Sequence, residues 1–340
     1  MNTARSFDDV LLQPKYSNIE SRSEVILNSS LDQNISLSLP VISSPMDTVT
    51  GVAMAIAMDK CHGLGVIHRY SSIEQQAVMV KDSYYAGVKN VAAAIGMSGD
   101  YIERAAELVR SGASVLCVDV AHGHHKMMEK CIKSLKDRLG DSIHIMAGNV
   151  ATLKAFEDLA CWGADSIRVG IGGGSICSTR LVTGHGIPTF QSILECANTS
   201  YDVKIIADGG IKTTGDMVKA YAAGADFVMI GSMLSGTTET PGEVFVGKEG
   251  KKYKIYRGMA SANAQNAWRG KASTPEGVST TVPFRGSVDL ILQNIAGGIR
   301  SGLSYSGARS LAELRSKASF VLQTGAGQVE SSTHILRRHQ

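Results

Sequence analysis

The chain has 340 residues, of which 44% are hydrophobic and 19% are charged. These fractions are near globular averages, so they exclude a disordered or fibrous protein and allow a large buried core. The formal net charge is only +3 and no dense basic run occurs, which gives no electrostatic case for nucleic acid as a partner.

Membrane insertion and disulfide formation are not expected either. No apolar run reaches the roughly 18 residues that a membrane span needs, and the N-terminus MNTARSFDDV has no hydrophobic signal core. The six cysteines lie far apart without a CxxC pair, which suits a reducing compartment and argues against a zinc site. We expect a cytoplasmic protein without a membrane partner.

Short apolar runs alternate with longer amphipathic stretches through the first two-thirds of the chain, a pattern typical of parallel strands joined by crossover helices. Strands are predicted over 40–44, 64–68, 90–95, 115–119, 143–148, 166–171, 203–208 and 226–231. Helices are predicted over 72–83, 100–111, 125–138, 152–162 and 214–223.

Three glycines stand between a predicted helix and the next strand: Gly112, Gly163 and Gly224. Glycine there supplies the left-handed conformation that ends a helix. The repeated units favour the α/β class and a single (β/α)8 TIM barrel over residues 1–340, with its site at the C-terminal mouth of the barrel. An open doubly wound sheet is the alternative, but its G-x-G-x-x-G fingerprint is missing after the first strand.

The alternation stops after the eighth strand. Residues 233–285 are charged, polar and Gly-rich, and we predict a flap that crosses the mouth without regular structure, either a functional lid or a disordered linker. A last helix is predicted over 287–301. The tail, residues 318–340, is expected to pack on a neighbouring subunit or to be partly disordered.

The loop that follows the sixth strand carries the strongest catalytic signal. It contains four glycines, then Cys177, Thr179 and Arg180. Such glycines let backbone amides approach an anion or carbonyls converge on a cation, and a cysteine on an accessible loop can act as a thiolate nucleophile. The alternative is a tight turn followed by an ordinary buried cysteine.

Strands seven and eight end in a second set of candidate residues. Asp208 precedes Gly209-Gly210, and Gly231-Ser232 follows the last strand. A carboxylate at a strand end can bind both hydroxyls of a ribose, and glycine-rich turns after strands seven and eight often bind phosphate in barrels. Together they predict a nucleoside monophosphate; the alternative for Asp208 is a cap for the helix near 214.

Two further features have open interpretations. Asp119 is followed by His122, His124 and His125, for which we prefer a polar wall of the pocket over a metal site, because no second ligand cluster of suitable spacing occurs. Glu276 in the flap is either a general acid or base delivered when the flap closes, or a solvated loop side chain.

These residues resemble the family of inosine monophosphate (IMP) dehydrogenases and guanosine monophosphate (GMP) reductases, over nearly the whole chain. The motifs that carry the resemblance are Ser44–Val49, Val118–His124, Ala147–Asn149, Gly170–Arg180, Ala207–Ile211, Val228–Ser232, Tyr256–Met259 and Gly297–Ser301.

The resemblance implies a role for each matching residue. Cys177 would attack purine C2 and form a covalent intermediate, while Thr179 and Glu276 would handle a proton. Asp208 would hold the ribose. The phosphate would be bound by Ser175, Gly210, Gly231, Ser232 and Tyr256, and the base would be contacted by Met46, Gly258 and Met259, while Ser44 would also bind the substrate. Asp119 and Asn149 would contact the nicotinamide cofactor, and carbonyls of Gly172, Gly174 and Cys177 would bind K⁺. The resemblance also implies a homotetramer.

The flap separates the two activities within this family. The segment from Gly258 to Glu276 is shorter than the flap of the dehydrogenases and lacks their Arg-Tyr pair, although Ser44-Pro45-Met46 and the stretch 324–331 look more like a dehydrogenase. The regulatory module that dehydrogenases insert between strands two and three is also absent. We expect an NADPH-dependent GMP reductase. The alternatives are an IMP dehydrogenase that uses NAD and a nucleotide-binding protein that has lost catalysis.

Overall fold

Eight parallel strands form a closed barrel in the computed structural model, which describes residues 3–331. Around the barrel the strands follow the order β10-β11-β4-β5-β6-β7-β8-β9. Their bounds are β4 Val41–Ser43, β5 Leu64–Ile67, β6 Val91–Ile95, β7 Ala113–Asp119, β8 His144–Val150, β9 Ser166–Val169, β10 Lys204–Asp208 and β11 Phe227–Ile230. Each lies at a predicted strand, so the (β/α)8 barrel is confirmed and the open sheet is wrong.

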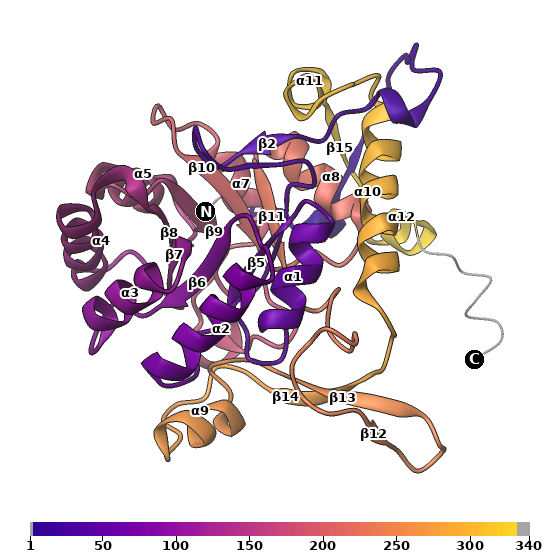
Figure 1. Ribbon diagram of the computed structural model, residues 1–340. Helices are drawn as coiled ribbons and strands as arrows, with labels where there is room; N and C mark the ends of the chain where they lie inside the picture. The colour runs from indigo at the N-terminus through magenta and orange to yellow at the C-terminus, as the bar shows by residue number, and fades with distance from the viewer. Residues whose placement is uncertain (1–2, 332–340) are drawn as a thin grey trace.

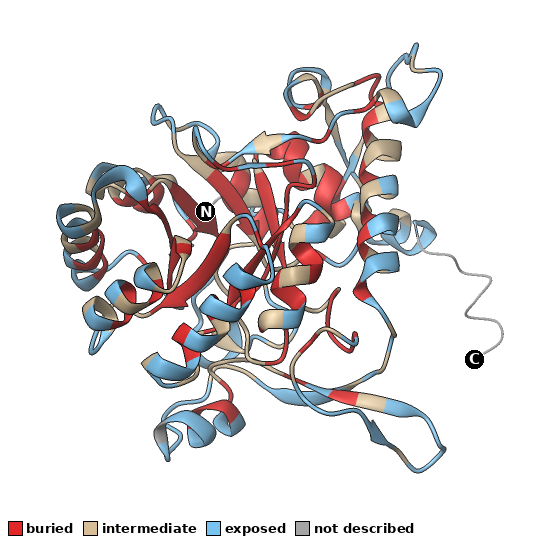
Figure 2. Ribbon diagram, viewed as in Figure 1, coloured by how far each residue is buried: buried red, intermediate tan, exposed pale blue. Residues whose placement is uncertain are grey.

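Helices surround the barrel, and the strands are its most buried part (Figures 1 and 2). The longer helices are α1 Val52–Lys60, α2 Ile73–Tyr85, α3 Tyr101–Arg110, α4 Lys126–Leu139, α5 Leu153–Trp162, α7 Thr189–Cys196, α8 Thr214–Ala223 and α10 Val288–Tyr305. Side chains alternate along each strand: in β4, Ile42 lies in the barrel interior while Val41 packs in the core formed with the helices. No helix of the described part of the chain is long and apolar enough to span a membrane.

The three predicted cap glycines adopt the expected conformation. Their φ angles are +110° at Gly112, +107° at Gly163 and +121° at Gly224, all in the region that favours glycine. Gly163 and Gly224 are the C-cap residues of α5 and α8. Each therefore ends a helix and turns the chain into the next strand.

The flap is not structureless, which corrects the prediction for residues 233–285. It contains β12 Phe245–Val246, β13 Lys252–Arg257, α9 Ala262–Arg269 and β14 Ser279–Pro283, and the three strands form an antiparallel sheet. The sheet extends from the barrel as an arm at the bottom of Figure 1. Buried Lys254 fixes its base, because Nζ donates to the carbonyls of Thr237 at 3.1 Å and Thr240 at 2.5 Å.

The tail packs on its own chain as far as residue 331. β15, Phe320–Leu322, pairs antiparallel with β1, Val10–Leu12, and α12 follows over Gly325–Glu330. Phe190 connects this ribbon to the barrel, since its ring centroid lies 5.7 Å from that of Phe7 and 5.0 Å from that of Phe320. Residues 320–330 are therefore regular structure packed on their own chain, which corrects the expectation of disorder there, while packing on a neighbouring subunit stays a prediction and residues 332–340 lie outside the described residues.

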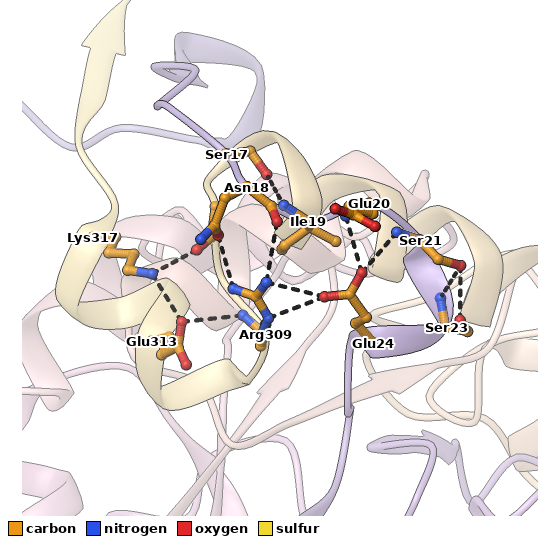
Figure 3. Close-up of polar contacts among 11 residues, drawn as sticks. Ser17, Asn18, Ile19, Glu20, Ser21, Ser23, Glu24, Arg309, Glu313 and Lys317 are labelled. Carbon is orange, nitrogen blue, oxygen red and sulfur yellow. Dashed lines mark hydrogen bonds and ion pairs between the residues drawn. The ribbon is translucent and has the colours of Figure 1, made fainter.

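A second contact between the two ends of the chain involves Arg309, which precedes α11 (Leu311–Lys317) (Figure 3). Its guanidinium donates to Glu24 Oε2 at 3.0 Å and to Asn18 Oδ1 at 3.0 Å, and its backbone N–H donates to Glu313 Oε2 at 3.2 Å. This network holds residues 18–24 against the last helices.

The N-terminal end of the barrel is covered by a hairpin of β2, Ser29–Ser30, and β3, Ser36–Leu37. Asp32 in its turn accepts a hydrogen bond from His144 at 2.7 Å, and the other ring nitrogen of His144 lies 2.8 Å from Ser166 Oγ. The opposite end of the barrel is thereby left as the open mouth.

Candidate active site

A pocket of about 450 Å³ lies at the C-terminal ends of the barrel strands. Its walls come from the loops after β4, β9, β10 and β11 and from the flap. Every residue to which the family resemblance gives a role lines it: Ser44, Met46, Asp119, Asn149, Gly172, Gly174, Ser175, Cys177, Thr179, Asp208, Gly210, Gly231, Ser232, Tyr256, Gly258, Met259 and Glu276. The structure thus brings these residues together, while their individual roles remain predictions.

The loop between β9 and the short helix α6, Thr179–Thr183, presents Cys177 to solvent. Gly170 has a φ of +146°, and a Cβ there would lie 1.9 Å from the carbonyl oxygen of Asp208, so only glycine fits this close approach. The Cys177 thiol donates to Thr179 Oγ1 at 3.1 Å. The alternative of an ordinary buried cysteine is wrong.

Backbone hydrogen bonds hold Glu276 beside this loop. The N–H of Ser178 donates to the Glu276 carbonyl at 3.0 Å, and the N–H of Glu276 donates to the carbonyl of Ala260 at 3.0 Å. Cys177 also forms an isolated antiparallel bridge with Gly277. The flap therefore returns from α9 directly to the cysteine loop, so that Glu276, Thr179 and Cys177 all line one pocket.

Asp208, the last residue of β10, is tightly held at one oxygen. Oδ2 accepts hydrogen bonds from Asn149 Nδ2 at 2.8 Å and from Arg168 Nη2 at 2.8 Å. The cap of α8 is instead Thr213, whose side chain accepts from the N–H of Asp216. The alternative of Asp208 as a helix cap is wrong.

Hydroxyl groups and glycine turns converge at the end of the pocket formed by β11 and β13. Ser175 Oγ lies 3.4 Å from the hydroxyl of Tyr256, and burial raises the pKa of Tyr256, which keeps it a neutral donor. A Cβ at Gly231 would lie 3.3 Å from that hydroxyl and 3.4 Å from Ser44 Oγ. Exposed backbone N–H groups at glycine turns and nearby hydroxyl donors suit a bound phosphate.

The loops that would contact the base are joined by an ion pair between Asp47 and Arg257. Arg257 Nε lies 3.1 Å from Asp47 Oδ2, and the Asp47 N–H points to Met259 Sδ at 3.4 Å. Met46 and Met259, one on each loop, both line the pocket. The ion pair therefore joins the two loops that carry these flexible apolar side chains.

Asn149 and Asp119 present polar groups on the β7–β8 side of the pocket. Asn149 Oδ1 is buried and has no hydrogen-bond partner among the described residues. Asp119 Oδ1 accepts from Arg168 Nη1 at 2.5 Å, and its Oδ2 lies 3.9 Å from Arg69 Nε. A buried acceptor without a donor fits an amide N–H of a ligand, such as the carboxamide of nicotinamide.

The predicted cation loop is partly engaged with its own chain. The Gly174 carbonyl accepts from the Cys177 N–H at 3.1 Å, and Arg180 Nη2 donates to the carbonyls of Ile171 at 3.4 Å and Ile187 at 2.8 Å. Main-chain carbonyls are suitable oxygen donors for a hard cation. The K⁺ site remains a prediction.

The histidines after β7 do not form the polar wall that we expected, since none of them lines the pocket. His124 Nε2 lies 2.9 Å from Asp158, and the His125 side chain accepts from the Met127 N–H at the start of α4. Residues 3–331 contain no group of His, Cys, Asp or Glu that could hold a metal ion.

Arg168 is the main site residue that the sequence analysis missed, and Arg69 and Tyr70 also line the pocket. The guanidinium of Arg168 lies inside the barrel. Burial opposes its charge, but Cys117 and the carboxylates of Asp119 and Asp208 raise the pKa of Arg168 well above its ordinary value. A lone arginine within the apolar strand Ser166–Val169 is the signal that could have found it, because a buried charge needs partners.

Comparisons with known proteins identify the family of the chain. Residues 4–334 match the family model described as IMP dehydrogenase / GMP reductase domain. The IMP dehydrogenase of Nitrosopumilus maritimus is 33% identical, with 97% of this chain and 98% of that protein covered. A GMP reductase of Buchnera aphidicola is 38% identical, with 94% of each chain covered.

A solved structure is similar over the same extent. The crystal structure of GMP reductase C318A from Trypanosoma brucei in complex with guanosine 5'-monophosphate matches with a TM-score of 0.92 and 32% identity, over 98% of each chain. The family model and these relatives together span nearly the whole chain. This chain therefore belongs to the IMP dehydrogenase / GMP reductase family, whose members are purine nucleotide oxidoreductases.

Proposed function

We propose that this protein is a GMP reductase that converts GMP to IMP and ammonia through a covalent intermediate on Cys177. The observation that carries the proposal is the flap. Of its described side chains between Ser261 and Pro275, none lines the pocket, whereas Glu276 does. The flap therefore places a carboxyl group at the cysteine loop and provides no Arg-Tyr pair to activate water.

In the proposed reaction, the sulfur of Cys177 bonds to purine C2, and the C2 amino group leaves as ammonia. Glu276 and Thr179 pass a proton to the departing nitrogen, since Thr179 Oγ1 lies 3.1 Å from the sulfur. When hydride reaches C2, the C–S bond breaks, the sulfur leaves as thiolate, and IMP forms.

The ribose, the phosphate and the base of the nucleotide would each be held by different residues of the pocket. Asp208 would accept hydrogen bonds from the ribose hydroxyls, and Ser175, Gly210, Gly231, Ser232 and Tyr256 would bind the phosphate. Met46 and Met259 would contact the base, with Ser44 and Gly258 beside it. The GMP complex of the Trypanosoma brucei relative supports a purine nucleotide in this position.

The family uses a nicotinamide cofactor, and we propose NADPH for this chain. Reduced nicotinamide supplies the hydride that the reaction consumes. The unpaired acceptor of Asn149 fits its carboxamide, with Asp119 nearby. We also propose K⁺ at the carbonyls of Gly172, Gly174 and Cys177. A cytoplasmic location stays a prediction. A homotetramer is also a prediction, and light scattering after gel filtration would test it.

The test is to mix the purified protein with GMP and NADPH, and separately with IMP and NAD, and to follow nicotinamide absorbance over many turnovers. We expect NADPH oxidation with ammonia release from the first pair. Steady NADH production from the second pair would overturn the proposal in favour of an IMP dehydrogenase. A protein that binds nucleotide but turns over neither pair would be a member that has lost catalysis.

A further inference from the structure

One guanidinium holds the carboxylates on both sides of the pocket. Arg168 on β9 donates to Asp208 Oδ2 on β10, through Nη2 at 2.8 Å and Nε at 3.2 Å, and to Asp119 Oδ1 on β7, through Nη1 at 2.5 Å. The arginine side chain is 7% exposed, and the two carboxylates are 16% and 15% exposed. These three charges form a nearly buried network at the mouth of the barrel.

A purely structural role does not explain this network well. Replacing buried ion pairs by apolar residues of similar size is often neutral or stabilising, so they are weak evidence for a contribution to stability. The strands below Arg168 do present apolar or thiol side chains in the barrel interior, such as Ile206 and Cys117, and Cys117 Sγ is 3.5 Å from Nη1. The charged layer occurs where the barrel meets the pocket.

The contacts determine which oxygen of Asp208 remains available. Oδ2 receives Arg168 Nη2, Arg168 Nε and Asn149 Nδ2, while Oδ1 has no hydrogen-bond partner among the described residues. Two guanidinium nitrogens and one amide nitrogen all donate to Oδ2, so this oxygen is held in place by three donors from two residues. Oδ1 is thereby the acceptor left for a ligand.

We propose that Arg168 is a positioning residue that orients Asp208 so that Oδ1 accepts a hydrogen bond from the nucleotide 2′-hydroxyl, which makes the site selective for ribonucleotides over 2′-deoxyribonucleotides. The proposal rests on the proposed function, because it requires a nucleoside monophosphate in this pocket. It adds a residue and a specificity that the family membership does not assign to this chain.

The test compares dissociation constants for GMP and 2′-deoxy-GMP by isothermal titration calorimetry. A hydrogen bond to a charged acceptor corresponds to about a 10- to 100-fold difference in affinity, which is the ratio we expect for the unmodified protein. In Arg168→Met the two dissociation constants should differ by less than about threefold. A general loosening of the site would weaken both nucleotides and leave the ratio unchanged, so the ratio reports the orientation of Asp208.

Arg168→Lys and Arg104→Lys complete the design. Lysine keeps the charge at residue 168 but cannot bind two carboxylates with a planar fork, so the ratio should fall there too. Arg104 on α3 is also buried, with bonds to Gln76 at 2.7 Å and Asp100 at 2.8 Å, but it lies outside the pocket. Its lysine variant should keep the full ratio.

Each outcome decides the proposal. A folded Arg168→Met or Arg168→Lys protein that discriminates as the unmodified protein does would overturn it. If circular dichroism shows that the methionine variant is unfolded, the lysine variant decides. An unmodified protein that binds both nucleotides equally would also overturn the role of Asp208 Oδ1, whereas one that binds no purine nucleotide would overturn the proposed function itself.

Discussion

The indole Nε1 of Trp268 donates a hydrogen bond to Asp47 Oδ2 at 3.3 Å, which ties helix α9 of the flap to the loop after the first barrel strand. The same carboxylate receives Arg257 at the end of β13. The ring of Trp268 also lies 6.0 Å from that of Tyr70, which lines the pocket. One carboxylate therefore holds both the end of β13, at Arg257, and helix α9, at Trp268, which precedes Glu276 in the flap.

Replacing Trp268 should affect catalysis more than stability. Trp268→Ala removes the hydrogen bond and the ring contact. We expect kcat to fall about 3- to 10-fold, which is less than for a buried contact because Trp268 is 40% exposed. Trp268→Phe keeps the contact with Tyr70 and should retain more activity. Steady-state kinetics of both variants measures this, and an unchanged kcat in the alanine variant would show that α9 does not position Glu276.

Cys177→Ala should abolish turnover while nucleotide binding stays within a few fold, since the pocket keeps its phosphate and ribose contacts. Activity assays and calorimetric titration with GMP measure the two effects. Cys161→Ala is the matched control, because that cysteine is also exposed but lies on α5, outside the pocket. Measurable turnover by the Cys177 variant would remove the covalent mechanism.

Glu276→Gln should slow the release of ammonia by about 10²- to 10⁴-fold, the usual contribution of a positioned acid or base. Rapid-quench measurement of ammonia in a single turnover isolates this step. Glu249→Gln serves as the control, since that flap carboxylate is 75% exposed and pairs with Lys251. Equal rates for the two variants would return Glu276 to the role of a solvated loop side chain.

His144 should make folding stability depend on pH. Burial lowers the pKa of His144 in the folded protein below its ordinary value of 6.5. Below pH 6.5 the unfolded chain therefore binds a proton that the folded chain does not, so the free energy of unfolding falls as pH drops toward the folded pKa, by up to about 1.4 kcal/mol per pH unit.

Urea denaturation at pH 7.5 and 5.5 measures this dependence. His144→Asn removes the titrating ring, so the loss of stability between the two pH values should be smaller than in the unmodified protein. It should not vanish, because burial also lowers the pKa of His68. Identical losses in the two proteins would exclude His144 as a source of acid sensitivity.

Two of the cap glycines should differ in their tolerance of alanine. An added Cβ would lie 2.5 Å from Ala197 Cβ at Gly224, but 3.3 Å from the flexible Lys136 Cγ at Gly163. Both substitutions place a side chain at positive φ, at a cost of about 1–2 kcal/mol. Gly224→Ala should therefore destabilise more than Gly163→Ala in urea denaturation, and equal losses would contradict the role of the Ala197 contact.

The barrel could be predicted from the sequence because its signals are local. Each strand is a short apolar run, and Gly112, Gly163 and Gly224 mark turns whose conformation does not depend on distant parts of the chain. The site was predictable for the same reason, since its residues follow the strands directly. Parallel strands in a barrel bring such residues to one end.

The missed features depend on contacts between distant residues. Strand β13 pairs with β14, which lies beyond α9 in the sequence. Strand β1 pairs with β15 from the opposite end of the chain. Neither partner is visible from local periodicity. Arg168 was not predicted as a site residue because its role depends on ion pairs with Asp119 and Asp208. Only the closed barrel brings these two carboxylates to one guanidinium.

The ribbon of β1 and β15 connects the end of the chain to the nucleotide pocket, so limited proteolysis at this ribbon would affect the pocket. Phe320 packs on Phe190, Phe190 packs on Phe7, and a Cβ at Gly210 would lie 3.8 Å from the ring of Phe7. Cleavage between α11 and β15 would free Phe320 while leaving every barrel strand intact. The turn that carries Gly210 would then lose its support from behind, so a nick near the end of the chain would reach the nucleotide pocket.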